Sequence, residues 1–332
     1  LYLCISSNEE TPNNQHMKLP SLLILGIIFI QFFGCQNPNL LKPKEGFLEV
    51  EGGKIWYGVF GSGNKTPILV LHGGPGYPSY YLNSLKSLAN DRSVILFDQL
   101  GCGRSDILTD TTLMTIDAYV AQTRKLIEHL KIEKVIIYGH SWGTMLGTEY
   151  YKKYPDNIDA LILGSPSIDL NMWQNDTDKL LAQLPDSIRV PLVNHKNNSI
   201  PDTTALNKAI DYFYHEFYTR KLPLSKDIIK ADSSWYAKES TVYEYMWGIE
   251  EYSVNGILNG YDGKEILKKI NVPVLYITGE FDTATPWTVK KYQEITPNSR
   301  LEIIEEAGHQ TLNDNEEIEL KIIESFLNEL KE

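Results

Sequence analysis

Residues 135–144 read Val-Ile-Ile-Tyr-Gly-His-Ser-Trp-Gly-Thr, and this stretch decides the fold of the chain. Four β-prone residues precede a Gly-x-Ser-x-Gly turn, and the small residues after it favour the start of a helix. A tight strand-to-helix turn lifts a serine hydroxyl out of the sheet, where a base can activate it. Glycines at both ends of the turn permit strained dihedral angles and close packing. The stretch therefore predicts a strand, a turn that presents Ser141 as a nucleophile, and a helix.

The composition is that of a globular protein and argues against several classes of partner. The chain has 332 residues, enough to bury a full core, and 42% of them are hydrophobic. Its formal net charge of −12 argues against a nucleic-acid partner. It contains no Gly-x-Gly-x-x-Gly after a strand, no Walker loop and no His/Cys cluster. We therefore expect neither a nucleotide cofactor nor a metal.

The N-terminal region has the pattern of a secretion signal. A basic residue after Met17 is followed by a short apolar run at 22–30 and then by Gly34-Cys35. This ending resembles the lipobox of bacterial lipoproteins, in which the cysteine is lipidated and becomes the mature N-terminus. The pattern predicts a lipoprotein anchored to the bacterial cell envelope through Cys35; an uncleaved membrane anchor is the alternative.

These observations divide the N-terminal region into three parts. Residues 1–16 precede the start methionine that we favour and are expected to be an upstream extension without a fold. Residues 17–35 form the predicted signal peptide. Residues 36–46 contain two prolines and several polar side chains, and we expect a linker there.

The remaining chain alternates between apolar strands and helical segments. A hairpin is predicted around Gly52-Gly53, and a helix over 116–130. Further strands are expected at 66–71, 93–97, 135–138, 160–164, 272–278 and 301–304. Such alternation predicts a mostly parallel sheet covered by helices on both faces. We assign residues 47–164 and 268–332 to this α/β core. The intervening residues 165–267 are polar, aromatic and helical in pattern, and we expect them to form an inserted helical cap.

A nucleophilic serine needs a base, and the base needs an orienting carboxylate. In sheets of this type the three residues follow one another along the chain as serine, acid and histidine, each after a strand. His309 is the histidine with this order and a loop position, since it follows the strand at 301–304. Asp282 follows the strand at 272–278 and is preferred over Glu280 as the acid, because the extra residues carry it into the loop. The predicted catalytic residues are Ser141, Asp282 and His309.

The tetrahedral intermediate of acyl transfer needs backbone N–H donors for its oxyanion. Trp142, the residue after the nucleophile, supplies one of them. The second is expected from the glycine-rich loop at residues 72–76, His-Gly-Gly-Pro-Gly, where the absence of side chains lets the backbone approach the substrate. Gly74 is the residue that we choose.

Three glycine-containing motifs occur in order along the chain: His-Gly-Gly-Pro-Gly at 72–76, Asp-Gln-x-Gly-x-Gly-Arg-Ser at 98–105 and Gly-His-Ser-Trp-Gly at 139–143. Together they resemble the motifs of the proline iminopeptidases. The resemblance implies an α/β-hydrolase fold with an inserted cap, and a serine enzyme that removes N-terminal residues from peptides. Residues 243–252 are similar to a cap segment of that family. By that match Glu251 holds the free α-amino group of the substrate, and Glu250 is the alternative if the alignment slips by one residue.

Two departures bear on specificity. Ile249 stands where the family has a proline, and residues 221–223 lack a cap acid that some members carry. The resemblance therefore implies an aminopeptidase acting on short peptides through an acyl-enzyme, without implying strict selectivity for proline. An esterase or amidase with the same triad but no recognition of the amine is the first alternative. A catalytically inactive surface binding protein is the second.

Overall fold

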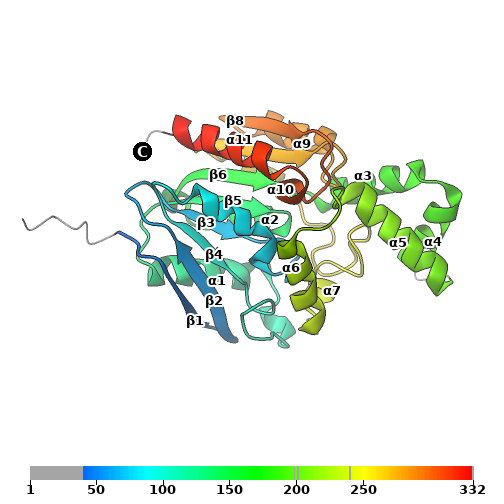
Figure 1. The fold of residues 1–332 in the computed structure, drawn as a ribbon, viewed down its shortest axis with the longest axis horizontal. Helices are drawn as coiled ribbons and strands as arrows, with labels where there is room; N and C mark the ends of the chain where they lie inside the picture. The colour runs from blue at the N-terminus through cyan, green and yellow to red at the C-terminus, as the bar shows by residue number, and fades with distance from the viewer. Residues whose placement is uncertain (1–39, 198, 200–201, 239–240, 331–332) are drawn as a thin grey trace, which may run out of the picture. The chain divides into compact units, whose positions relative to one another are not determined.

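The computed structural model describes residues 40–197, 199, 202–238 and 241–330. Its centre is an eight-stranded sheet in the order β1-β2-β4-β3-β5-β6-β7-β8, in which the strands from β4 to β8 are parallel (Figure 1). The strands are β1 (Lys44–Val50), β2 (Gly53–Phe60), β3 (Ile68–Leu71), β4 (Val94–Phe97), β5 (Val135–His140), β6 (Ile158–Gly164), β7 (Val274–Gly279) and β8 (Ser299–Ile304).

The predicted linker is shorter than expected at its C-terminal end. Lys44, Glu45 and Gly46 belong to β1, because they pair in antiparallel register with residues 57–59 of β2. Residues 36–39 of the linker, the predicted signal peptide and Cys35 lie outside the described residues. In the part of the chain that the structure describes, every helix is too short or too polar to cross a bilayer.

Side chains that alternate along the central strands sort the core into two faces. Leu69 and Ile137 belong to the apolar cluster that includes side chains of α1 (Ile116–His129), α2 (Trp142–Lys153) and α9 (Pro286–Ile295). Ile68 and Ile136 point to the opposite face. There they join the cluster that includes η1 (Ser79–Leu88), α10 (Thr311–Asp314) and α11 (Glu316–Glu329). The prediction of a sheet covered on both faces is confirmed, and it follows from the two-residue period of a strand.

Helices fill the segment between β6 and β7. They are α3 (Leu170–Gln183), α4 (Asp186–Lys196), α5 (Thr203–Phe217), α6 (Lys226–Ala237), α7 (Val242–Met246) and α8 (Lys264–Leu267). In Figure 1, α3, α4 and α5 stand away from the sheet, and Leu181, Leu192 and Phe213 belong to a separate apolar cluster there. All six of these helices lie within the predicted cap of 165–267. Ile266 and Leu267 of α8 are buried in the same apolar cluster as the sheet, and so are Val242 and Met246 of α7.

Two short helical turns complete the fold, η2 (Thr111–Leu113) and η3 (Pro155–Asn157). The parallel strands β3, β5, β6, β7 and β8 all end at the same edge of the sheet. The segments that follow β3, β5, β7 and β8 carry Gly74, Ser141, Asp282 and His309, because the C-terminal ends of parallel strands meet at one edge. Glu250 and Glu251 come instead from the cap, after α7.

Candidate active site

Ser141 occupies a strained turn between β5 and α2. Its backbone has φ 53° and ψ −122°, a conformation that residues with a side chain seldom adopt. A Cβ atom on Gly139 would lie 2.4 Å from the carbonyl oxygen of Gly143, and one on Gly143 would lie 2.0 Å from the carbonyl oxygen of Leu71. Only glycine fits at these two positions. The turn expected from the Gly-x-Ser-x-Gly pattern is thus present, and packing rather than flexibility requires its glycines.

Asp282 and His309 form a buried hydrogen bond. Nδ1 of His309 lies 2.7 Å from Oδ1 of Asp282, and the same oxygen accepts a 2.7 Å hydrogen bond from the N–H of Ala284. A carboxylate only accepts, so Nδ1 carries the proton and Nε2 keeps its lone pair, as a general base requires. Glu280, the competing acid, faces elsewhere, since its Oε2 accepts from the backbone N–H of Glu306 at 3.1 Å.

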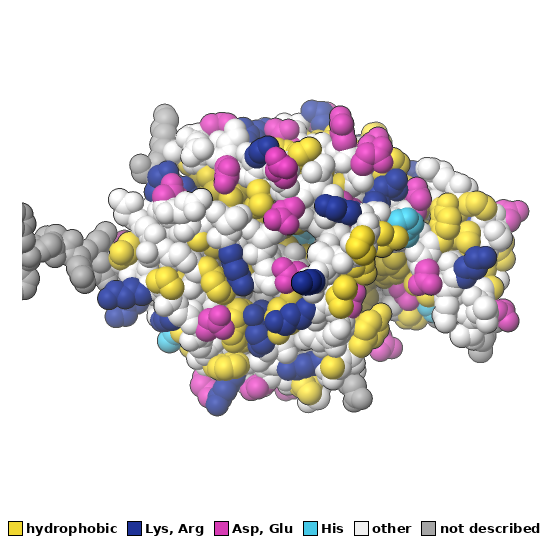
Figure 2. Space-filling model, in the orientation of Figure 1, with side chains coloured by type: hydrophobic (Ala, Val, Ile, Leu, Met, Phe, Trp, Pro, Cys, Tyr) yellow, Lys and Arg dark blue, Asp and Glu magenta, His cyan; other side chains and the backbone are white. Residues whose placement is uncertain are grey.

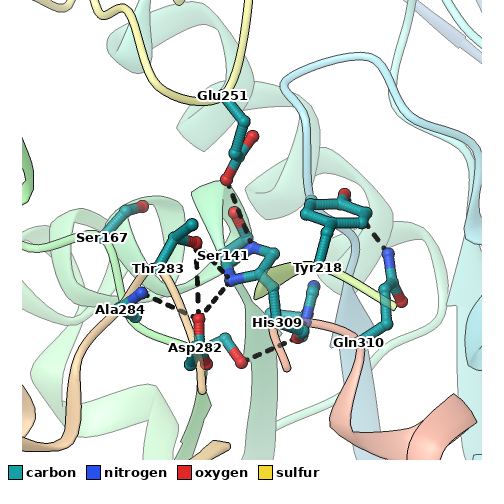
Figure 3. A network of polar contacts seen from close by, with 12 residues as sticks. Ser141, Ser167, Tyr218, Glu251, Asp282, Thr283, Ala284, His309 and Gln310 are labelled. Atoms are coloured by element: carbon teal, nitrogen blue, oxygen red, sulfur yellow. Dashed lines mark hydrogen bonds and ion pairs between the residues drawn. The ribbon is translucent and has the colours of Figure 1, made fainter. Parts of the chain in front are cut away.

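Figure 3 places Ser141 and the imidazole of His309 at the centre of the site, with Asp282 and Glu251 reaching the ring through different nitrogens. Two hydrogen bonds link the serine and histidine loops through Gly164 and Ser165 at the end of β6. The N–H of Ser141 donates to the carbonyl of Gly164, and the hydroxyl of Ser165 donates to the carbonyl of His309, both at 2.9 Å. Nε2 of His309 makes no hydrogen bond to any described residue. It is therefore available to a substrate or to the serine hydroxyl.

A second buried histidine, His140, holds the loop of His309 in place. Its Nε2 lies 2.9 Å from the carbonyl of His309, which can only accept, so Nε2 carries the proton. Nδ1 then accepts from the hydroxyl of Tyr81 at 2.9 Å, and that hydroxyl oxygen accepts from the N–H of Gly73 at 2.8 Å. Burial, followed by the charge of His309, lowers the pKa of His140 to about 3, which keeps it neutral. Sequence reasoning missed this network, because nothing in the pattern links Tyr81 to a residue in the loop after β8.

The candidate oxyanion donors are unpaired. The N–H of Gly73 is taken by Tyr81, whereas the N–H groups of Gly74 and Trp142 form no hydrogen bond to a described residue. Gly74 has φ +107°, and a Cβ there would lie 2.6 Å from the backbone nitrogen of Tyr77. The structure thus leaves free the two amides that the sequence singles out.

The electrostatics favour an ionised Asp282. Burial raises the pKa of Asp282. The charge and hydrogen bond of His309, with further hydrogen bonds, outweigh this effect, so that the pKa of Asp282 lies below its usual range. Burial lowers the pKa of His309. The charge and hydrogen bond of Asp282, followed by the charge of Glu251, outweigh this effect and place the pKa of His309 above its usual range. A negative group on each side of the ring thus stabilises the imidazolium.

Glu251 follows α7 and reaches the ring of His309 from the cap. Its Oε1 lies 3.6 Å from Nε2 of His309 and makes no hydrogen bond to a described residue, whereas Oε2 accepts from the hydroxyl of Tyr243 at 3.1 Å. The residue is only 5% exposed, and burial raises the pKa of Glu251, with His309 and Tyr243 opposing the rise. Glu250 accepts from the hydroxyl of Tyr214 at 2.9 Å, and burial raises the pKa of Glu250 to about 7. Both predicted cap residues therefore lie near the site, and Glu251 is the one beside His309.

A cavity of about 700 Å³ separates the cap from the core. Gly74 and Ser141 line it on the core side, and Tyr214, Tyr243, Glu250 and Glu251 line it on the cap side. Figure 2 shows hydrophobic side chains gathered between α6 and α5 on the face that it draws. Within the described ranges, no group of three His, Cys, Asp or Glu side chains could hold a metal ion.

The comparisons with known proteins agree with this geometry. Residues 66–315 match the model of the α/β hydrolase fold family, and the chain is an α/β-hydrolase. A proline iminopeptidase of Heyndrickxia coagulans is 37% identical over 287 residues, which cover 86% of this chain and 99% of the relative. The chain belongs to the proline iminopeptidase family and is an enzyme, a serine hydrolase of the aminopeptidase type.

Two solved structures have the same fold, and one of them is a proline iminopeptidase. The crystal structure of a proline iminopeptidase from Mycobacterium smegmatis has a TM-score of 0.80 and 28% identity, covering 86% of this chain and 98% of that one. The crystal structure of VinJ has a TM-score of 0.82 and 28% identity, covering 87% of this chain and 100% of that one. The family assignment leaves the alternative of a catalytically inactive binding protein without support.

Proposed function

We propose that this enzyme removes N-terminal residues, proline or other apolar residues among them, from short peptides with a free α-amine. Ser141 is the nucleophile, and His309 is the general base and acid. Asp282 orients the imidazole of His309 and stabilises the imidazolium that forms. The N–H groups of Gly74 and Trp142 bind the oxyanion. Glu251 binds the α-ammonium group of the substrate.

The position of Glu251 carries this proposal. A buried carboxylate is costly unless a cation or several hydrogen bonds compensate it. Oε1 of Glu251 has neither a hydrogen bond nor a lysine or arginine among the described residues, and it lies 3.6 Å from the nitrogen that acts on the scissile bond. A peptide whose first carbonyl carbon lies at Ser141 brings its ammonium group close to that oxygen. The substrates of an endopeptidase or a simple esterase carry no ammonium group beside the scissile bond, so a carboxylate at this position would have no partner.

The chemistry proceeds in two halves. The hydroxyl of Ser141 attacks the first carbonyl carbon while Nε2 of His309 takes its proton. The resulting imidazolium then protonates the nitrogen of the departing peptide, which leaves an acyl-enzyme. Water, deprotonated by the same Nε2, attacks the ester carbonyl and frees the N-terminal residue and Ser141.

N-acetylation of a substrate tests this proposal directly. We expect kcat/KM for aminoacyl-amide substrates, prolyl-amide included, to fall by about 100-fold on acetylation. A charge-assisted contact worth roughly 1.5–3 kcal/mol is lost and the carboxylate stays unpaired. The measurement is a turnover screen of matched free and acetylated substrates. Equal rates for the two sets would contradict recognition of the amine and favour the esterase or amidase alternative. The assignment of the triad would not be affected.

We propose further that the enzyme is a lipoprotein of the bacterial cell envelope, anchored through Cys35. The proposal rests on the short apolar run at 22–30 and on Gly34-Cys35 at its end. Acyl chains on Cys35 contribute membrane affinity of ~0.8 kcal/mol per buried CH₂ group. Mass spectrometry of the mature protein is expected to find a lipidated N-terminal Cys35. A retained Met17, or cleavage at another residue, would contradict the lipoprotein assignment.

A further inference from the structure

The cavity continues beyond the catalytic residues along an aromatic wall that ends at a second carboxylate. The ring of Tyr243, whose hydroxyl bonds Glu251, packs edge-on against Trp235 with ring centroids 5.2 Å apart. The ring centroids of Trp235 and Tyr77 lie 5.5 Å apart, and the hydroxyl of Tyr77 donates a 2.7 Å hydrogen bond to Oδ1 of Asp232. Asp232, Trp235 and Tyr77 all line the cavity, and we refer to them as the Asp232 subsite.

Acidic side chains outnumber basic ones in the lining of this cavity. Four carboxylates line it, Asp211, Asp232, Glu250 and Glu251. His215 is the basic side chain among the described lining residues, which include no lysine or arginine. Asp232 pairs with no basic side chain in the described part of the chain, and its one hydrogen-bond donor is a neutral phenol. Burial raises the pKa of Asp232, and only the hydrogen bond from Tyr77 opposes the rise. A cation in the ligand is the group that such a carboxylate lacks.

Two independent observations point to a ligand rather than to a solvated acidic surface. Glu251, at the other end of the wall, is 5% exposed and has an oxygen without a hydrogen bond. The volume of about 700 Å³ is also that of a site for a drug-sized molecule. A small N-terminal residue held between Ser141 and Glu251 leaves the stretch toward Asp232 empty.

We propose that this enzyme prefers peptides whose N-terminal residue is lysine or arginine. The α-ammonium group binds Glu251, and the side-chain cation binds Asp232 against the rings of Tyr77 and Trp235. The apolar stem of lysine or arginine suits the aromatic wall, and its charged end suits a carboxylate flanked by aromatic faces. This inference rests on the proposed aminopeptidase function, because the position of the α-amine decides where the side chain points.

The test compares lysyl and norleucyl substrates with the same leaving group. Norleucine keeps the apolar stem of lysine and lacks its ammonium group. In the unmutated enzyme we expect kcat/KM for the lysyl substrate to be at least about ten-fold higher, since a partly exposed charge pair with aromatic neighbours contributes at that level. The preference should weaken as ionic strength rises from about 0.05 M to about 0.5 M.

Asp232→Asn is expected to abolish this preference, lowering kcat/KM for the lysyl substrate and leaving that for the norleucyl substrate nearly unchanged. Asp227→Asn is the matched control. Asp227 lies on the same helix, accepts a 3.0 Å hydrogen bond from Asn83, and is outside the cavity lining. We expect the Asp227 variant to keep the full preference for lysine.

The outcomes separate this inference from the function on which it rests. If free-amine substrates are cleaved and acetylated ones are not, but lysyl and norleucyl substrates react equally, the subsite proposal is wrong and the aminopeptidase stands. The same holds if Asp232→Asn and Asp227→Asn behave alike. If acetylated and free substrates react equally, the aminopeptidase proposal fails and the subsite proposal fails with it.

Discussion

Ser141→Ala is expected to lower kcat for aminoacyl-amide substrates by ~10³-fold or more while the protein remains folded. The substitution removes only one heavy atom, the hydroxyl oxygen, so the turn between β5 and α2 keeps its packing. Residual activity comes from the unpaired amides of Gly74 and Trp142 and from substrate binding, which still act on attack by water. Steady-state kinetics on purified protein, with circular dichroism to establish folding, checks the prediction.

His309→Ala and Asp282→Asn are expected to cause losses of similar order. An asparagine can be accommodated, because the hydroxyl of Thr278, 3.0 Å from Oδ2 of Asp282, can accept from its amide while donating to the carbonyl of Ala284. The 3.4 Å hydrogen bond from the N–H of Gly279 to Oδ2 is absent in this variant. The loss then arises from the missing negative charge beside the imidazolium rather than from unfolding. The combined Ser141→Ala and His309→Ala variant should be scarcely slower than either single variant, since the residues act as a unit.

Ser167→Ala serves as the control for these substitutions. Ser167 is a buried serine near the site in Figure 3, and its hydroxyl makes no hydrogen bond to a described residue, so its removal leaves no partner unsatisfied. We expect this variant to keep near-normal kcat. A folded His309→Ala protein with near-normal kcat would show that another group is the base.

The strand-to-helix turn could be predicted from sequence because its requirements are local. Gly139 and Gly143 are required because a Cβ atom at either position would lie less than 3 Å from neighbouring backbone atoms. The order of serine, acid and histidine is equally readable, since each follows an apolar strand. The sequence favours Asp282 over Glu280 only through its place further into the loop, and the contacts add the physical reason: Asp282 bonds His309, whereas Glu280 accepts from the N–H of Glu306.

The cap could be predicted only as a helical insertion. The shape of the cavity beneath it depends on how α6 packs against η1. It also depends on the hydrogen bond between Tyr77 and Asp232, which are 155 positions apart in the sequence. No local pattern encodes a contact of that range. The same limit hid the network from Gly73 through Tyr81 and His140 to His309, in which ordinary residues gain a role from tertiary packing alone.

Glu251→Gln is expected to lower kcat/KM for free-amine substrates by about ten- to a hundred-fold. The glutamine keeps the size of the side chain and can still accept from the hydroxyl of Tyr243, so the cap should remain in place. It removes the charge that pairs with the substrate ammonium, a contact worth roughly 1.5–3 kcal/mol in a partly desolvated site. Simple ester substrates without an amine should be affected much less, and parallel kinetics on both substrate types measures the difference.

The same substitution should change the pH dependence in a direction that a merely structural role would not produce. The base must be neutral, so kcat/KM rises with pH through the pKa of His309, which Asp282 and Glu251 hold above 6.5 against the effect of burial. Loss of the Glu251 charge lowers that pKa, so the acidic limb of the profile moves to lower pH. Glu250→Gln is the matched comparison, since Glu250 bonds Tyr214 and has no contact with His309. A large loss in the Glu250 variant, with little change in the Glu251 variant, would assign the amine to Glu250 instead.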